Sequence, residues 1–230
     1  PTPGAIGTPF TDLPGQYIKL DGTNNYLNFP SVDTDVLDFT KQWAVSMKVK
    51  NVAGVNDSSY TITYKRGKNE ITLRKGGSNW GLYVYCDGVA IGQANTWYAP
   101  TLDSDIVFIC SGTRLEYYLN GARRAYLTFN GNVSNNDPIG DLQIGNTGIA
   151  GGYWYGGIKD ALIMVGANSQ LTSTQVNEYR NNTTPTSLSY YASLLDYLPF
   201  GADAFPNIVG LKGVVNGTLV GGNESDFVNI

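Results

Sequence analysis

The chain contains no histidine, only two cysteines and few charged residues. Of its 230 residues, 15 are Lys or Arg and 19 are Asp or Glu, which gives a formal net charge of −4. Without histidine, the chain lacks the commonest general base and a common zinc ligand. Two cysteines are too few for a thiolate zinc site or a disulfide framework. The acidic balance argues against nucleic acid as a partner, because that ligand requires a basic face.

Long apolar runs are missing as well. None approaches the roughly 20 residues that span a bilayer, so we expect no membrane partner. The chain starts PTPGAIGTPF, without the basic segment and apolar core of a signal peptide. Pro1 fits a product that has lost its initiator methionine, so synthesis in a cytoplasm is favoured over secretion. Cys86 and Cys110 are therefore predicted to be free thiols in strands, with a cross-strand disulfide as the alternative.

The composition favours short strands joined by tight turns. The chain has 28 glycines and 16 tyrosines, and 42% of its residues are hydrophobic, enough for a sizeable core. Residues 43–50, WAVSMKVK, alternate large apolar side chains with small or charged ones, as a strand with one buried face does. Asn120-Gly121 predicts a two-residue type I′ hairpin turn. Residues 16–167 thus predict an all-β fold, a two-sheet antiparallel jelly-roll sandwich.

One short helix and a defined core complete this prediction. The helix is expected over Leu171–Arg180, with Thr172 or Ser173 as N-cap and Asn181-Asn182 at its end. Ten apolar positions are expected to be mostly buried, some of them facing the other way from the rest: Trp43, Val45, Met47, Val84, Val107, Ile109, Leu119, Leu142, Ile158 and Leu162.

Six motifs occur in a characteristic order along the chain. They are an Asp-Gly-x-Asn-x-Tyr turn within Lys19–Leu27, the strand at 43–49, the hairpin Tyr117–Gly121, Ile144–Asn146, Tyr155–Ile163 and the helix start Leu171–Gln175. Together they resemble the laminin-G-like, concanavalin-A-like β-sandwich over about residues 17–181. Modules of this kind recur in phage virion proteins, as decoration, knob or tail-associated components. The resemblance therefore implies a lectin-like sandwich and suggests a virion context.

The chain divides into three predicted segments. Residues 1–16 are rich in proline and form an extended N-terminal arm, and residues 17–185 form the sandwich. Residues 186–230 form a C-terminal segment. In relatives, a strand and then an Asn-Gly-Thr stretch often precede the Asp-Gly turn. Here their counterparts, Leu195–Phe200 and Asn216–Leu219, come after the sandwich. This segment either completes its own sandwich, as in a permuted fold, or contacts a neighbour, and both would cover an open sheet edge.

Three aromatic residues between glycines are the candidate carbohydrate site. Tyr153, Trp154 and Tyr155 stand in the run GGYWYGG, and an exposed aromatic ring on a loop offers a flat apolar face to a sugar. The alternative is that these residues belong to the core. The resemblance makes Tyr155 a core residue before the closing strand, and at least one of the three is expected to point inward.

The acidic stretch at 33–38 is the candidate metal site. Asp33, Asp35 and Asp38 offer carboxylate oxygens in a predicted loop, where calcium is the ion that they could hold. The alternative is that they cap turns through hydrogen bonds to backbone amides. We expect no cofactor, with calcium as the alternative.

Two sets of residues are candidate assembly contacts. Ile6, Phe10 and Leu13 give the arm apolar anchors for a neighbouring subunit, although a frayed terminus is the simpler interpretation. A basic cluster could dock on an acidic partner, or could protect the edge of a hairpin; its candidate contacts are Lys65, Arg66 and Lys68.

No catalytic residues are predicted. Glycosidases on such a fold place carboxylates at alternate positions of one strand, whereas Glu70, Glu116, Glu178 and Glu224 are isolated. The leading prediction is a non-enzymatic virion structural protein, made in the host cytoplasm and contacting other virion proteins or copies of itself. The alternative is a carbohydrate-binding adhesion module, on a virion or secreted, that recognises a cell-surface polysaccharide. A glycoside hydrolase ranks third.

Overall fold

The structure is a computed structural model that describes most of the chain. The described residues are 16–30, 32–33, 35–51, 61–76, 79–95, 103–129, 133, 139–146, 154–181, 184–199, 205–222 and 226–229. The predicted anchors Ile6, Phe10 and Leu13 lie outside these ranges.

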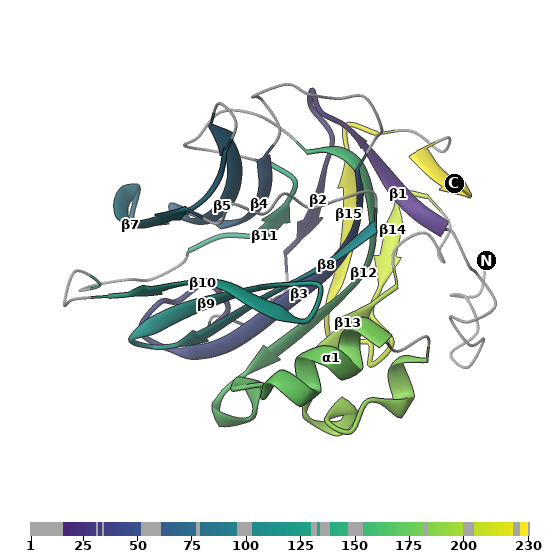
Figure 1. Cartoon of the computed structure of the whole chain (residues 1–230). Helices are drawn as coiled ribbons and strands as arrows, with labels where there is room; N and C mark the ends of the chain where they lie inside the picture. The colour runs from purple at the N-terminus through teal and green to yellow at the C-terminus, as the bar shows by residue number, and fades with distance from the viewer. Residues whose placement is uncertain are drawn as a thin grey trace.

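In the described part of the chain, two antiparallel sheets of eight strands each form the fold (Figure 1). In sheet A the order is β10-β9-β8-β3-β12-β1-β16, with β13 also paired to β12, and in sheet B it is β14-β15-β2-β11-β4-β5-β6-β7. The predicted all-β sandwich is confirmed. The strands are β1 (Gln16–Asp21), β2 (Tyr26–Phe29), β3 (Gln42–Asn51), β4 (Thr61–Arg66), β5 (Asn69–Gly76), β6 (Asn79–Cys86), β7 (Val89–Asn95), β8 (Asp103–Ser111), β9 (Arg114–Leu119), β10 (Ala122–Thr128), β11 (Leu142–Ile144), β12 (Tyr155–Val165), β13 (Asp196–Leu198), β14 (Asn207–Val209), β15 (Asn216–Val220) and β16 (Phe227–Asn229).

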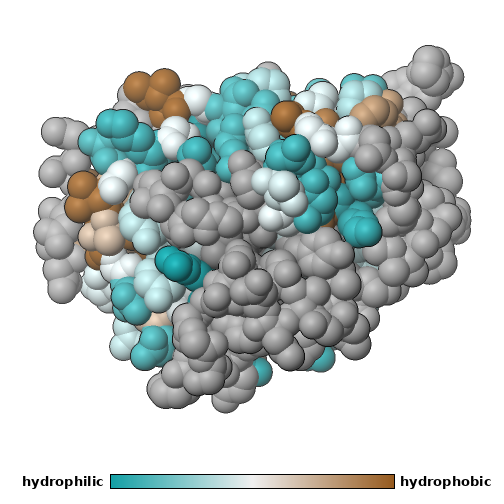
Figure 2. All heavy atoms as spheres, turned by 90° about the horizontal axis from the view of Figure 1, so that it is seen from above, coloured by the Kyte–Doolittle hydropathy of each residue, from teal (hydrophilic) through white to brown (hydrophobic). Residues whose placement is uncertain are grey.

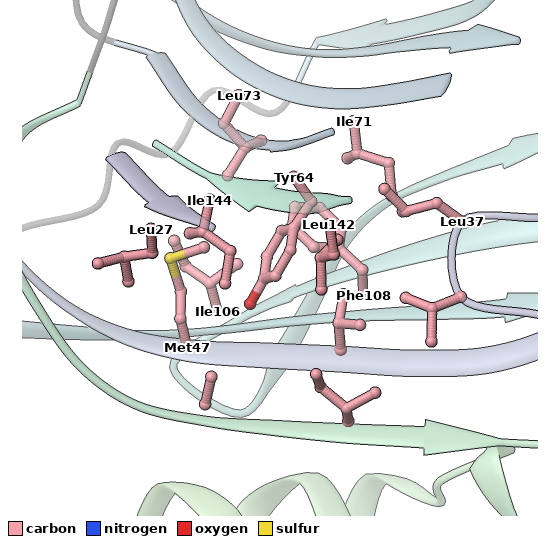
Figure 3. Close-up of a cluster of buried hydrophobic side chains, with 14 of the residues drawn as sticks. Leu27, Leu37, Met47, Tyr64, Ile71, Leu73, Ile106, Phe108, Leu142 and Ile144 are labelled. Carbon is pink, nitrogen blue, oxygen red and sulfur yellow. The ribbon is translucent and has the colours of Figure 1, made fainter. Parts of the chain in front are cut away.

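The main core lies between the two sheets. Figure 3 shows Tyr64, Leu142 and Ile144 of sheet B pointing toward Met47 and Phe108 of sheet A. All ten positions expected in the core are buried, with at most 4% of their surface exposed. Three of them face the other way, as the prediction allowed, and pack in a second cluster on the outer side of sheet A: Val107, Ile109 and Leu162.

Helix α1 (Ser173–Asn181) covers this second cluster, below sheet A in Figure 1. The Gln175 backbone N–H donates to Thr172 Oγ1 over 3.3 Å, and the Thr172 N–H donates to Gln175 Oε1 over 2.9 Å. This reciprocal pair is a capping box, which satisfies two amides at the helix start. The inward side chains Val176 and Tyr179 are buried against the sheet. The helix prediction is confirmed, with Thr172 as the cap.

The hairpin between β9 and β10 turns at Asn120 and Gly121. Their φ angles are 51° and 78°, the left-handed region that a type I′ turn requires at both central positions. Leu119 pairs with Ala122 across the turn, so the loop has the predicted length.

The C-terminal segment adds strands to both sheets of its own sandwich. In sheet B, β15 pairs with β2 and carries β14 at its side, and in sheet A, β13 pairs with β12 while β16 pairs with β1. In this structure the segment pairs with strands of its own chain. β15 and β16 cover the edges that β2 and β1 would otherwise present to solvent.

A buried carboxylate organises this segment. Asp196 is fully buried, and its two oxygens accept backbone N–H groups from Tyr197, Lys212, Val214 and Val215 at 2.7–2.9 Å. One side chain therefore joins β13 to the turn between β14 and β15.

Both cysteines are free and buried, as predicted. Burial is the main reason that the pKa of Cys110 rises to about 12, and burial also raises the pKa of Cys86. Both thiols therefore stay protonated near neutral pH and act as small apolar side chains. No helix in the described part of the chain is long and apolar enough to cross a bilayer.

Candidate functional site

A row of polar and aromatic side chains crosses the outer face of sheet B. The register places Asn28 beside Gln143, Gln143 beside Lys65, Lys65 beside Glu70, and Glu70 beside Tyr85. Each of the five is flanked along its strand by at least one residue of the main core. Because successive side chains of a strand point to opposite faces, this row points away from the core. We call these five residues the polar row.

Side-chain amides at one end of the polar row form a hydrogen-bonded chain. Asn146 Nδ2 donates to Gln143 Oε1 over 2.9 Å, Gln143 Nε2 donates to Asn28 Oδ1 over 3.3 Å, and Asn28 Nδ2 donates to Asp141 Oδ2 over 2.8 Å. All four side chains are half-buried, so the chain is held in place yet reaches the surface. An amide has two donor hydrogens and an oxygen with two lone pairs, so these bonds leave capacity for a ligand.

Two tyrosines stand at the other end of the face. Tyr83 and Tyr85 are two residues apart on β6 and therefore share one side of the sheet. Both are partly exposed, and Gln93 Nε2 donates to the Tyr83 hydroxyl over 3.4 Å. A partly exposed tyrosine presents an apolar ring and a polar hydroxyl together, which suits a ligand with both kinds of surface.

A buried acid lies between the amide chain and the tyrosines. Glu70 is fully buried, accepts a hydrogen bond from Thr72 Oγ1 over 2.5 Å and pairs across the strands with Lys65. The pKa of Tyr85 is raised, first by partial burial and then by the negative charge of Glu70, while Arg74 acts in the opposite direction. Tyr85 is therefore a protonated hydroxyl donor over the neutral pH range.

The surface on this side of the molecule is hydrophilic, as the residues of the polar row are. Figure 2 views the molecule from above, the side on which β4, β5 and β7 lie in Figure 1. Among the described residues on this side, hydrophilic colours predominate and hydrophobic ones form separate small groups. Such a face can offer hydrogen bonds to several groups of one ligand, and the described residues on it form no large apolar patch of the kind that marks a hydrophobic protein interface.

The predicted aromatic sugar platform is corrected at Trp154, because only 1% of its surface is exposed. The residue is fixed by its backbone: its N–H donates to the Gly145 carbonyl over 3.2 Å, and its carbonyl accepts from the Gly22 N–H over 3.1 Å. The ring belongs to the main core, and its buried Nε1 has no hydrogen-bond partner within the described ranges. Tyr153 and the side chain of Tyr155 lie outside those ranges.

The predicted calcium site is also corrected. The described residues hold no group of three acidic, histidine or cysteine side chains that could bind a metal ion. Asp33 Oδ1 instead accepts the Asp35 backbone N–H over 2.9 Å, and Asp38 Oδ1 accepts both the N–H and the hydroxyl of Thr40. Asp33 and Asp38 therefore cap turns, which is the alternative stated for them.

Of the basic candidates for assembly, Arg66 is corrected as a docking residue. It is 5% exposed, and its guanidinium donates to the carbonyls of Val32, Asp33, Val36 and Gly140. These hydrogen bonds hold Val32, Asp33 and Val36 against the sheet.

The other two basic candidates have different surroundings. Lys65 is half-buried within the polar row, whereas Lys68 is exposed and its Nζ lies 3.2 Å from Asp87 Oδ1. The three basic residues do not form one accessible patch.

No family model matches the chain, and no curated protein matches it. Solved structures, by contrast, do match the chain. A protein from Bacteroides ovatus, proposed to bind carbohydrate, superposes with a TM-score of 0.60 at 14% identity; the match covers 90% of this chain but 59% of that one.

Two further structures match over most of their own length. The CBM40 module of a Ruminococcus gnavus IT-sialidase, bound to α2,3-sialyllactose, has a TM-score of 0.52 at 12% identity and covers 72% of this chain and 96% of its own. A heptameric SAP-like pentraxin from Limulus polyphemus has a TM-score of 0.52 at 18% identity and covers 74% and 83%. At such low identities the likeness shows the fold alone, a two-sheet jelly-roll sandwich.

Proposed function

We propose that this chain is a non-enzymatic carbohydrate-binding module and that its ligand lies across the outer face of sheet B. The observation that carries the proposal is the polar row, with its amide chain at one end and two tyrosines at the other. A sugar ring combines hydroxyl groups on its edge with apolar C–H groups on its faces. The half-buried amides match the hydroxyls, and the tyrosine rings match the C–H faces.

The similar structures favour this function over the virion structural role that the sequence put first. Two of the three reported above are described through carbohydrate, one as a proposed carbohydrate-binding protein and one in complex with a sialylated sugar. This support is an analogy of fold, because a shared sandwich does not transfer a ligand. The polar row supplies the argument specific to this chain.

The proposal includes no hydrolytic step. Glycoside hydrolysis needs two carboxyl groups roughly 5–10 Å apart on either side of the scissile bond. Glu70 lies on the outer face of sheet B, and Glu116 lies on β9 in sheet A. Glu70 is moreover fully buried and already bonded to Thr72.

A glycan-array screen of the purified chain tests the proposal. We expect at least one glycan to bind, and we expect Asn28→Ala, which breaks the amide chain at its centre, to weaken that binding by about tenfold. Asn168→Ala is the matched control, because Asn168 is exposed on the short turn after β12, in contact with sheet A. Equal loss in both variants, or binding to no glycan, would contradict the proposal.

A further inference from the structure

A small pocket lies on the opposite sheet from the polar row. It has a volume of about 130 Å³ and is lined by Ile109, Ser111, Arg114, Glu116, Gln170 and Leu171. These residues come from β8, β9 and the segment just before α1. Ligand pockets for whole small molecules usually measure 300–1,000 Å³, so this one fits a substituent of a larger ligand.

The walls of the pocket are held rigidly. Ile109 and Leu171 belong to the packed cluster beneath α1. Gln170 Nε2 donates to the Cys110 carbonyl over 2.7 Å and contacts Ser169 Oγ at 3.2 Å. The pocket is therefore preformed, and ordering its walls would cost a ligand little binding free energy.

A carboxylate in the wall is already neutralised. Glu116 Oε1 pairs with the guanidiniums of Arg114 and Arg123, the latter at 3.1 Å, and Glu116 Oε2 accepts the Tyr118 hydroxyl over 2.7 Å. Burial and the bond to Glu116 raise the pKa of Tyr118 to about 12, so this donor stays protonated. One negative charge thus faces two positive ones, and the group carries a net positive charge.

Both arginines still reach solvent. Their side chains are 46% and 50% exposed, whereas that of Glu116 is only 11% exposed. A guanidinium carries five N–H donors, and each of these arginines contacts Glu116 through a single nitrogen. Donors therefore remain for an incoming anion, held in position by the buried acid.

An exposed aromatic ring adjoins the arginines. Tyr126 is 57% exposed and stands opposite Glu116 in the register of β9 and β10. The guanidinium carbons of Arg114 and Arg123 lie 5.9 and 5.8 Å from its ring centroid. This pair of strands lies at the edge of sheet A (Figure 1).

We propose that Tyr126, Arg114, Arg123 and the adjoining pocket bind an acidic saccharide unit. The carboxylate of the sugar pairs with the arginines, the apolar face of its ring stacks on Tyr126, and one substituent enters the pocket. The positive charge is local in a chain of net charge −4, which suits one anionic group and not a polyanion such as nucleic acid. The site is separate from the polar row and does not depend on the function proposed for it.

A pair of ligands that differ only in charge tests this proposal. The full chain is titrated by calorimetry with oligogalacturonate, with its methyl ester and with a sialylated trisaccharide. We expect at least one acid to bind with an affinity that falls as salt rises, and the methyl ester to bind at least tenfold more weakly than the free acid if oligogalacturonate is the ligand. The proposal is overturned if neither acid binds, if the binding of the acid that does bind is independent of salt, or if oligogalacturonate binds and its methyl ester binds equally tightly.

Variants then locate the binding. Arg123→Gln and Tyr126→Ala are each expected to lower the affinity for the acidic ligand about tenfold. Tyr126→Phe keeps the aromatic ring and is expected to retain most of the affinity. Arg74→Gln is the matched control, because Arg74 is an exposed arginine on sheet B. Asn28→Ala is expected to leave this binding unchanged, which separates the site from the polar row. Polyglutamate binding as tightly as the sugar, or loss in Arg74→Gln equal to that in Arg123→Gln, overturns the proposal.

Discussion

At the scale of single residues, buried acids carry much of the specificity of this fold. Asp196 and Glu116 are each surrounded by donors, the first by backbone amides and the second by two arginines and a tyrosine. Neither role was predicted from the sequence. Three of the four amides around Asp196 come from residues 16 to 19 positions away. The donors around Glu116 are near in sequence, but only the register of β9 and β10 shows that they share one face of the sheet. By contrast, the turn-capping alternative stated for Asp33 and Asp38 depended only on neighbouring amides and is what the structure shows.

Asp196→Ala is expected to lower the free energy of unfolding by about 3 kcal/mol or more. The change leaves several amides without their acceptor in a buried place, and each costs roughly 1–3 kcal/mol unless water reaches it. Asp33→Ala, which removes one exposed turn cap, is expected to cost less than about 1 kcal/mol. Urea denaturation of both variants measures the difference; equal losses would show that Asp196 does not organise the segment.

Asp160→Asn is expected to stabilise the protein at neutral pH. Burial raises the pKa of Asp160 above its ordinary 3.8, against the opposing effects of Lys159, Lys48 and a hydrogen bond with Tyr197. The folded state therefore binds the proton more tightly than the unfolded state does. The stability gained from this proton is complete below the unfolded pKa and is lost as pH rises through the folded pKa.

Melting curves between about pH 3 and about pH 7 check this prediction. Asparagine stays neutral and also tolerates the positive φ of 47° at this position. The variant should gain on the wild type as pH rises, and the two should converge toward pH 3. A variant that melts below the wild type at pH 7 would contradict the account of Asp160.

At the scale of elements, short sequence patterns predicted those strands, turns and helix ends that depend on neighbouring residues. The alternation at 43–49 gave β3, the Asn120-Gly121 pair gave the β9–β10 turn, and Thr172 with Gln175 gave the start of α1. The polar row could not be predicted in this way. It joins β2 to β11 and β11 to β4, strands that lie far apart in the sequence, and only the register brings Asn28, Gln143 and Lys65 together.

Alanine variants of two glycines in equivalent turns test whether the β9–β10 hairpin contacts α1. Gly121 and Gly88 both have positive φ, 78° and 80°, so alanine strains the backbone by about 1 kcal/mol at either site. A Cβ at Gly88 would meet nothing within 4 Å, whereas one at Gly121 would lie 2.1 Å from Asn177 Oδ1 on α1. Gly121→Ala should therefore cost more than Gly88→Ala.

A second change identifies the cause of that extra cost. Adding Asn177→Ala to Gly121→Ala removes the atom that collides and should bring the penalty down toward that of Gly88→Ala. The comparison comes from thermal unfolding of the wild type, Gly88→Ala, Gly121→Ala and the double variant. Equal penalties for the two glycine variants would mean that the hairpin and the helix do not touch in solution.

At the scale of the whole molecule, the last strands close a sandwich that begins at the N-terminal side. The sequence left open whether this segment completes its own fold or a neighbour's. The reason is that the sequence of a strand does not show whether its partner strand belongs to the same chain. Here β15 pairs with β2 and β16 pairs with β1 of the same chain. A chain that ends at residue 204 lacks β14, β15 and β16, so we expect it to lose cooperative unfolding, as circular dichroism would show. A truncated chain that melts like the full one would contradict this.

The central claim, that the outer face of sheet B binds carbohydrate, is tested most directly by mapping a bound glycan on the protein. Two-dimensional ¹H–¹⁵N spectra of the labelled chain are recorded while the best ligand from the array is added. The account predicts that the largest shift changes fall on β2, β11 and β4–β6, with the side-chain amides of Asn28 and Gln143 among them. Shift changes confined to other surfaces, with the polar row unmoved at saturation, would contradict it.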